Sequence, residues 1–178
     1  ALVDVLEGVN ATAKEMASAG ISVLPIVADT TDQDDVTEMV TQVMDVFGSV
    51  DVLVNNAGTF SVVGPVWEVD PEKWFRDVKV NLYGSFLVSR AIVKGMVAQG
   101  SGYVINIVSS GGVGDPHPFS TSYASSKTGL MRLTEGLAAE AKPHGVKVFA
   151  VGPPAIRTQM TEFLMDDEGA KKWRPTFG

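Results

Sequence analysis

The sequence contains no cysteine and only two histidines, His117 and His144. These absences exclude a disulfide framework and a thiolate metal site, and we expect no metal ligands at all. No apolar run reaches the roughly 18 residues that span a bilayer, so no membrane partner is expected. Lysine and arginine form no cluster, and a net charge of −7 argues against nucleic acid as a partner.

What is present fits a soluble globular protein: 178 residues, of which 45% are hydrophobic. The chain does not begin with methionine, and its opening "ALVDV" resembles the second half of a strand. Its ending, "KKWRPTFG", closes no recognisable element. We therefore expect an internal piece of a longer cytoplasmic protein, with residues 1–178 forming one incomplete domain.

Short apolar runs rich in β-branched residues recur at 21–28, 50–54, 103–108 and 146–151. They are nearly continuous, which predicts strands buried on both faces of a sheet. Three helical patterns separate these runs. The first ends at Gly48, the second covers 71–99, and the third runs from Tyr123 to just before Pro143. This alternation predicts an α/β fold, a doubly wound parallel sheet with helices on both faces. Pro25 places the strand at 21–28 on an edge of that sheet.

Small or polar clusters follow each predicted strand, and open α/β sheets bind ligands at these carboxyl ends. In chain order the clusters are Asp4, "ADTTD" with Asp29, "NNAG" from Asn55 to Gly58, "SSGG" from Ser109 to Gly112, and "GPPAIRT" from Gly152 to Thr158. We expect a polar ligand at this edge.

Tyr123 and Lys127 are four residues apart and would share one face of a helix. A tyrosine phenol, with a pKa of about 10, is a poor base at neutral pH, but a cation within about 4–6 Å lowers that pKa. Such a tyrosine can protonate a carbonyl oxygen or deprotonate a hydroxyl. Taken alone, however, the pair could be an ordinary helix pair, with Ser120 and Ser122 as N-cap residues.

Four segments in order, "NNAG", "KVNLYGSF", "INIVSSGG" and "YASSK", resemble the motifs of the short-chain dehydrogenase/reductase family. The resemblance covers nearly the whole chain and implies a Rossmann-like fold. It also implies a catalytic set of Asn81, Ser110, Tyr123 and Lys127. Ser110, rather than Ser109, has the family spacing of thirteen residues before the tyrosine. The resemblance further implies that Asn81 helps to hold a proton-relaying water and that Lys127 contacts the nicotinamide ribose.

The implied reaction is hydride transfer between NAD and the CH–OH or C=O group of a secondary alcohol or ketone. The hydride needs a nicotinamide because no side chain can deliver one. A carboxylate at Asp4 would bind the adenosine ribose and repel a 2′-phosphate, which favours NAD over NADP; the alternative is a turn aspartate. The other cofactor-binding residues that the resemblance implies are Asp29, Thr30, Asn56, Ala57, Gly58, Tyr123, Lys127, Ile156 and Thr158.

Three departures from the family pattern keep a second hypothesis open. The glycine-rich turn that cradles the pyrophosphate, with the first strand, would precede Ala1, and the last strand would follow Gly178. Pro154 stands where the family has glycine, which weakens the expected contacts of Ile156 and Thr158. The alternative is therefore a catalytically silent relative that binds a nucleotide or a partner.

Two further expectations concern substrate and assembly. The segment after Thr158 offers an apolar lining that favours a moderately hydrophobic alcohol or cyclic ketone: Met160, Phe163, Leu164, Met165 and Trp173. The amphipathic helices around Phe86 and Leu133 resemble those through which the family forms dimers and tetramers. We therefore expect a homodimer or homotetramer of the intact protein.

Overall fold

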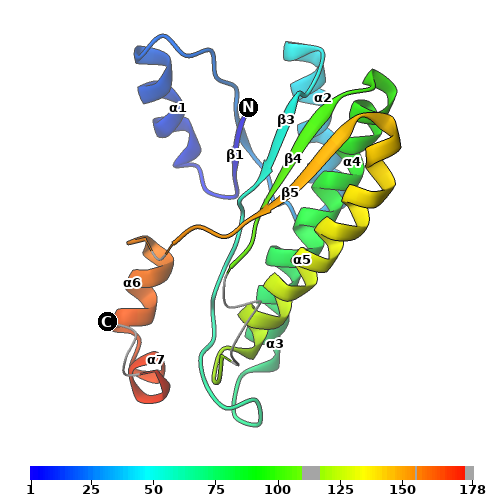
Figure 1. The fold of residues 1–178 in the computed structure, drawn as a ribbon. Coiled ribbons are helices and arrows are strands. Elements are labelled where there is room, and N and C mark those ends of the chain that lie inside the picture. The colour runs from blue at the N-terminus through cyan, green and yellow to red at the C-terminus, as the bar shows by residue number, and fades with distance from the viewer. Residues whose placement is uncertain (110–116, 155, 175–178) are drawn as a thin grey trace.

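The computed structural model describes residues 1–109, 117–154 and 156–174, whose arrangement is shown in Figure 1. Within these residues the strands form two parallel sheets. In the first, β1 (Leu2–Asp4) pairs with β2 (Pro25–Val27). In the second, β4 (Gly102–Ile107) lies between β3 (Val52–Asn55) and β5 (Val146–Val151).

No strand of the first sheet is hydrogen-bonded to a strand of the second among the described residues, so they form two sheets and not one. Among the described strands β2 is hydrogen-bonded to β1 alone, so the prediction of an edge position for Pro25 is confirmed. The strand is shorter than predicted, because residues 21–24 do not join the sheet.

Helices lie on both sides of these strands, as predicted. Figure 1 shows α2 (Gln33–Phe47), α4 (Ser85–Gln99) and α5 (Thr121–Ala141) beside the larger sheet, with α1 (Val9–Ser18) on the opposite side near β1. The main hydrophobic core forms between the helices and the strands. Its buried members include Ile26, Val36, Met39, Leu87, Val88, Ile92, Met96, Val104 and Val146.

The prediction that the strands are buried on both faces is wrong: Phe149 and Val151 of β5 are exposed, and β3 shows the difference between its faces most clearly. Val52 and Val54 are 52% and 50% exposed, whereas the side chain between them, Leu53, packs against the core. Successive side chains of a strand point to opposite faces, and the helices that pack on β3 and β4 lie on the Leu53 face. Apolar composition therefore identified the strand correctly but not the burial of its second face.

Local sequence signals account for the helix boundaries. Asp32 caps α2 by accepting hydrogen bonds from the backbone N–H groups of Asp34 and Asp35, and Gly48 ends it in the left-handed conformation at φ 75°. Asp70 caps α3 (Pro71–Val78) in the same way. The predicted helix 71–99 is helical throughout but contains a π-helical turn, η1 (Lys79–Gly84), between α3 and α4.

The C-terminal part holds two helices that the sequence did not predict, α6 (Gln159–Asp166) and α7 (Glu168–Trp173). Before them, α5 ends at Ala141, as expected from Pro143, and a short 3-10 turn, η3 (Lys142–His144), leads into β5. In the described part of the chain, no helix combines the length and the apolar character needed to cross a bilayer.

Candidate active site

Tyr123 and Lys127 lie in the first turns of α5, close to the carboxyl end of β4. The Lys127 Nζ is 5.8 Å from the centroid of the Tyr123 ring. It donates a 2.7 Å hydrogen bond to the carbonyl oxygen of Ile107, the last residue of β4. The side chain is 4% exposed, and this burial lowers the pKa of Lys127 to about 8.

Burial also acts on Tyr123, whose pKa is raised above its ordinary value. A side-chain hydrogen bond with Ser109 opposes this effect, and the negative charge of Asp77 reinforces it. The expectation that Lys127 lowers the pKa of Tyr123 is therefore wrong for this structure. The reason is that desolvation disfavours a phenolate, while the ammonium of Lys127 is engaged with a backbone carbonyl.

Asn81 lies in the π-helical turn and is fully buried. Its Oδ1 accepts from the Thr59 backbone N–H at 2.7 Å, and its Nδ2 donates to the Thr59 carbonyl and to the Ser126 Oγ, both at 2.9 Å. Asn81 thus joins the loop after β3 to the helix that carries Tyr123 and Lys127. Single-turn π-helices occur frequently at functional sites, and an interpretation of Asn81 as a solvated helix residue is wrong.

Gly58 completes this group. A Cβ atom built on it would lie 3.2 Å from the Asn81 Oδ1 and 3.6 Å from the Lys127 Nζ. The end of the "NNAG" segment therefore meets Asn81 and Lys127 at one place. Four of the predicted residues, Gly58, Asn81, Tyr123 and Lys127, come together in the structure.

The serine beside Tyr123 is Ser109. Ser110, which the spacing of thirteen residues predicts, lies outside the described residues. Ser109 stands two residues beyond the end of β4 at Ile107. The assignment of Ser110 stays a prediction.

The serines at the start of α5 do not act as ordinary helix caps. Ser120 occupies the N-cap position but makes no side-chain capping bond, and its Oγ donates instead to the carbonyl of His117 at 3.1 Å. The Ser122 Oγ donates at 2.6 Å to the Oδ2 of Asp77 in α3. These hydroxyls therefore make contacts within the site region that a simple cap would not require.

Two of the predicted cofactor residues lie at neighbouring strand ends. Asp4 ends β1, and its backbone carbonyl accepts from the N–H of Ala28, the residue before Asp29. The Asp4 Oδ1 also accepts from the Leu6 N–H at 2.9 Å, as a turn aspartate would, and the side chain is exposed. The Asp29 Oδ1 accepts from the Thr31 N–H at 2.8 Å. The parallel pairing thus places both carboxylates at one edge.

Thr30 lies against the π-helical turn that holds Asn81. A Cβ atom on Gly84 would lie 2.9 Å from the Thr30 Oγ1, which shows how closely the two segments approach. Asn56 and Ala57 follow β3 and are exposed. Thr30 therefore connects the edge of the smaller sheet with the group around Asn81.

Asn55, the first residue of "NNAG", is buried in a polar network that sequence reasoning did not resolve. Its Nδ2 donates to the Asn106 Oδ1 at 2.7 Å and to the Ser89 Oγ at 2.9 Å. Asn106 in turn donates to the Thr134 Oγ1 at 2.8 Å. The network fixes the ends of β3 and β4 against α4 and α5, and so holds the polar loops in place.

Ile156 and Thr158 are the predicted cofactor residues on the segment before α6 (Gln159–Asp166). Ile156 is exposed, and the Thr158 backbone N–H donates to the Thr161 Oγ1 at 2.7 Å within the same segment. No contact with Tyr123 or Lys127 is recorded for either residue in the described part of the chain. Their assignment continues to rest on the resemblance alone.

An apolar wall stands beside Tyr123. Phe60 stacks on the Tyr123 ring, and Met160 and Leu164 of α6 belong to the same cluster. Met160 and Leu164 were both predicted to line the substrate site. Met165 is exposed, Trp173 packs on Phe119, and the side chain of Phe163 lies outside what the structure describes.

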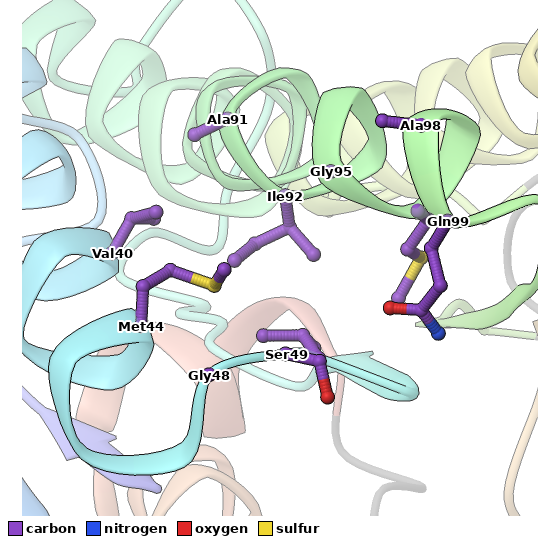
Figure 2. Close-up of a pocket in the computed structure, with 11 residues that line it drawn as sticks. Val40, Met44, Gly48, Ser49, Ala91, Ile92, Gly95, Ala98 and Gln99 are labelled. Carbon is purple, nitrogen blue, oxygen red and sulfur yellow. The ribbon is translucent and has the colours of Figure 1, made fainter.

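An apolar groove of about 360 Å³ lies elsewhere, between α2 and α4. Figure 2 shows Val40 and Met44 of α2 facing Ala91 and Ile92 of α4 across it. None of the residues that line it is among the predicted site residues.

In the ranges that the structure covers, no group of three or more histidine, aspartate or glutamate side chains is placed to hold a metal ion. The group around Tyr123 is thus the candidate active site.

The family model described as short chain dehydrogenase matches residues 2–169. A cis-4-hydroxycyclohexanecarboxylate dehydrogenase from Sinomonas cyclohexanicum is 34% identical over 165 residues, 92% of this chain and 66% of that protein. The chain spans between about half and two thirds of the length of the curated relatives it matches.

Two solved structures also match closely. A gluconate 5-dehydrogenase from Burkholderia cenocepacia, in complex with NADP and tartrate, is 28% identical with a TM-score of 0.86, covering 97% of this chain and 67% of that one. An NAD+-bound xylitol dehydrogenase is 27% identical with a TM-score of 0.85, covering 91% and 63%.

Proposed function

This chain belongs to the short chain dehydrogenase family, and we propose that its parent protein transfers a hydride between NAD and a secondary alcohol or ketone. The observation that carries the proposal is the meeting of Gly58, Asn81, Tyr123 and Lys127 at the end of β4. Tyr123 is the acid/base group in this proposal. The phenol is protonated at neutral pH, as a proton donor to a carbonyl oxygen must be, although its raised pKa makes it a weaker acid than a free tyrosine.

Ser109 is proposed as the second hydroxyl of the site, in the role that the family resemblance implies for Ser110. Its hydrogen bond with Tyr123 supports this role, because a substrate oxygen near Tyr123 could then meet both hydroxyls. Two donors directed at one oxygen stabilise the negative charge that develops there. Lys127 supplies a positive charge beside Tyr123, and Asn81 fixes the loop and the helix that frame them.

The described residues fit part of a nicotinamide dinucleotide site. The exposed carboxylate of Asp4 and the neighbouring Asp29 would hold the adenosine end, with Thr30, Asn56, Ala57 and Gly58 beside them. Lys127 would contact the nicotinamide ribose, and Ile156 and Thr158 the carboxamide. When bound, the nicotinamide supplies or accepts the hydride. Similar proteins include an NAD+-bound one and an NADP-bound one, and Asp4 favours NAD here.

A moderately hydrophobic, cyclic secondary alcohol or ketone is the proposed substrate class. Phe60, Met160 and Leu164 form an apolar wall beside Tyr123, which would pack on a hydrocarbon ring better than on a polyol. The similar dehydrogenase from Sinomonas is named for a cyclohexane hydroxy acid.

We also propose a homodimer or homotetramer formed through α4 and α5, which light scattering of the full-length protein at micromolar concentration would test.

The decisive experiment compares Tyr123→Phe with Tyr103→Phe in the full-length protein, assayed with NAD and NADP on cyclic alcohols and on polyols. Tyr103 is an exposed tyrosine of β4 and serves as the matched control. Loss of a general acid/base costs about 10²- to 10⁴-fold in turnover, and we expect such a loss for Tyr123→Phe alone. Near-normal turnover of that variant would disprove the proposed proton transfer.

A catalytically silent, nucleotide-binding protein is the second candidate. One observation favours it: the Lys127 ammonium is held by the Ile107 carbonyl, and the pKa of Tyr123 is raised rather than lowered. Fluorescence titration with NADH separates the two functions. Binding of NADH by a wild-type protein that turns over none of the substrate panel would support this candidate over the dehydrogenase.

A further inference from the structure

A carboxylate that the proposed mechanism does not use lies inside the site. Asp77 of α3 has no exposed surface. It accepts hydrogen bonds from the Ser61 backbone N–H at 2.9 Å, from the Ser61 Oγ at 2.5 Å and from the Ser122 Oγ at 2.6 Å. Burying a carboxylate is costly unless donors surround it, and three donors meet this one.

The bonds of Asp77 form a bridge between two segments. Ser61 belongs to the loop after β3, and Ser122 belongs to the first turn of α5. Asn81, one helical turn beyond Asp77, makes a second bridge between the same loop and the same helix, through Thr59 and Ser126.

The two bridges enclose the stacked aromatic pair. Phe60 lies between Thr59 and Ser61, the two loop residues that the bridges hold. On the helix, Tyr123 lies between Ser122 and Ser126, which the same bridges hold. The rings are 4.7 Å apart between centroids and inclined at 15°. Because both neighbours of Phe60 are fixed and both flanks of Tyr123 are fixed, the phenol has little freedom to turn away from the site.

We infer that Asp77 is a positioning residue for Tyr123, because its buried carboxylate ties the loop that carries Phe60 to the helix that carries Tyr123. The inference rests on the proposed function only in giving Tyr123 a chemical task. The geometry of the bridge does not depend on the reaction.

The charge of Asp77 adds an electrostatic role. The groups that face Tyr123 are Lys127 on its own helix, Ser109 after β4 and Asp77 on α3, with Arg76 beside Asp77. Phe60 of the loop after β3 and Met160 and Leu164 of α6 pack on Tyr123 with apolar side chains. Arg174, after α7, donates a hydrogen bond to Ser120 at the start of α5. The negative charge raises the pKa of Tyr123 and so favours the protonated phenol.

The test is a pH titration of the Tyr123 phenol in the full-length protein labelled with ¹³Cζ-tyrosine, followed by NMR. The signal is assigned by its absence from Tyr123→Phe. Asp77→Asn keeps an acceptor oxygen and a donor but removes the charge. We expect it to lower the pKa of Tyr123, because the negative charge that raises this pKa is gone. The control Asp45→Asn, at an exposed carboxylate of α2, should leave that pKa unchanged.

Ser122→Ala is the second variant, because it keeps the charge and cuts the bridge to α5. We expect faster flipping of the Tyr123 ring, followed through exchange of its two Cε signals in protein labelled with ¹³Cε-tyrosine, and a several-fold lower kcat. The pKa of Tyr123 should stay above its ordinary value, because the charge of Asp77 is kept. A Tyr123 pKa that does not fall in Asp77→Asn overturns the electrostatic role. Unaltered ring flipping in Ser122→Ala overturns the positioning role, even if Asp77→Asn does not fold.

These NMR measurements need no turnover, so they separate this inference from the proposed function. An inactive wild-type protein with the expected shifts would contradict the dehydrogenase assignment and leave the role of Asp77 standing. An active protein without the shifts would do the reverse.

Discussion

The ring of Phe60 stacks on the ring of Tyr123, with the centroids 4.7 Å apart and the planes inclined at 15°. Phe60 is buried, and its neighbours in the cluster include Leu164 of α6. One face of the proposed acid/base group is therefore covered by an aromatic ring and shielded from water. This contact contributes to the burial that raises the pKa of Tyr123.

Replacing Phe60 by leucine should keep the apolar character and remove the stacking. An aromatic pair is worth about 0.5–1.5 kcal/mol beyond its burial, which corresponds to a loss of roughly 2- to 12-fold in kcat/KM if the energy serves to orient Tyr123. Steady-state kinetics of the full-length protein would measure it. Phe75→Leu, at a ring of α3 that is 58% exposed, is the control, and equal effects of the two variants would contradict the role of Phe60.

Burial of Lys127 predicts a pH dependence of stability. Its pKa falls from 10.5 to about 8 on folding, so between these values the unfolded chain binds more protons than the folded one. The free energy of unfolding that is due to Lys127 should therefore rise with pH from about 8 to 10.5, by about 3 kcal/mol in total. Below about pH 8 the contribution is constant.

Denaturant unfolding of wild type and Lys127→Met between pH 7 and 10 would test this dependence. Titrating groups distant from Lys127 contribute equally to both proteins, so the difference between the two curves reports on Lys127 and its neighbour Tyr123. We expect the methionine variant to lack the rise. Parallel curves would show that Lys127 does not change its pKa on folding.

Asp4 should control the choice of cofactor. Removing its charge with Asp4→Asn removes the repulsion of a 2′-phosphate. The ratio of kcat/KM with NADP to kcat/KM with NAD should then rise by about tenfold or more, since each 1.4 kcal/mol corresponds to a factor of ten. Measurements on the full-length protein, with Asp45→Asn as control, would check the ratio. Asp4 also accepts a hydrogen bond from the Leu6 N–H. If its only role is to stabilise that turn, the ratio of kcat/KM with NADP to kcat/KM with NAD will not change.

Gly84 should tolerate no side chain, because a Cβ atom there would lie 2.9 Å from the Thr30 Oγ1 and 3.3 Å from the Thr30 carbonyl oxygen. Gly84→Ala is expected to lower the free energy of unfolding by about 1–3 kcal/mol through overpacking. Gly95→Ala, in α4, is a matched control because a Cβ atom there meets nothing within 4 Å. That change should be neutral or stabilising by up to about 1 kcal/mol. Circular dichroism during urea unfolding would distinguish the two, and a harmless Gly84→Ala would mean that the segments can separate.

Short-range signals were sufficient for much of the fold. The capping carboxylates of Asp32 and Asp70, the left-handed Gly48 and the stop before Pro143 act over a few residues, so their effects can be read from the sequence. The π-helical turn was not predictable in this way, because helix periodicity continues through it. The exposed face of β3 was also missed, because apolar composition does not say which neighbours a strand will have.

The sequence by itself determined the alternation of strands and helices from β2 to β5, the spacing of Tyr123 and Lys127 on one helix, and the placing of polar clusters at the strand ends. Only the tertiary structure decided that Ser109 bonds to Tyr123 and that Asp77 is buried beside it. Asp77 finds its partners 16 and 45 residues away. The direction of the Tyr123 pKa is likewise a tertiary property. Helix and strand signals depend on neighbours along the chain, whereas desolvation and charge depend on every segment that packs around a group.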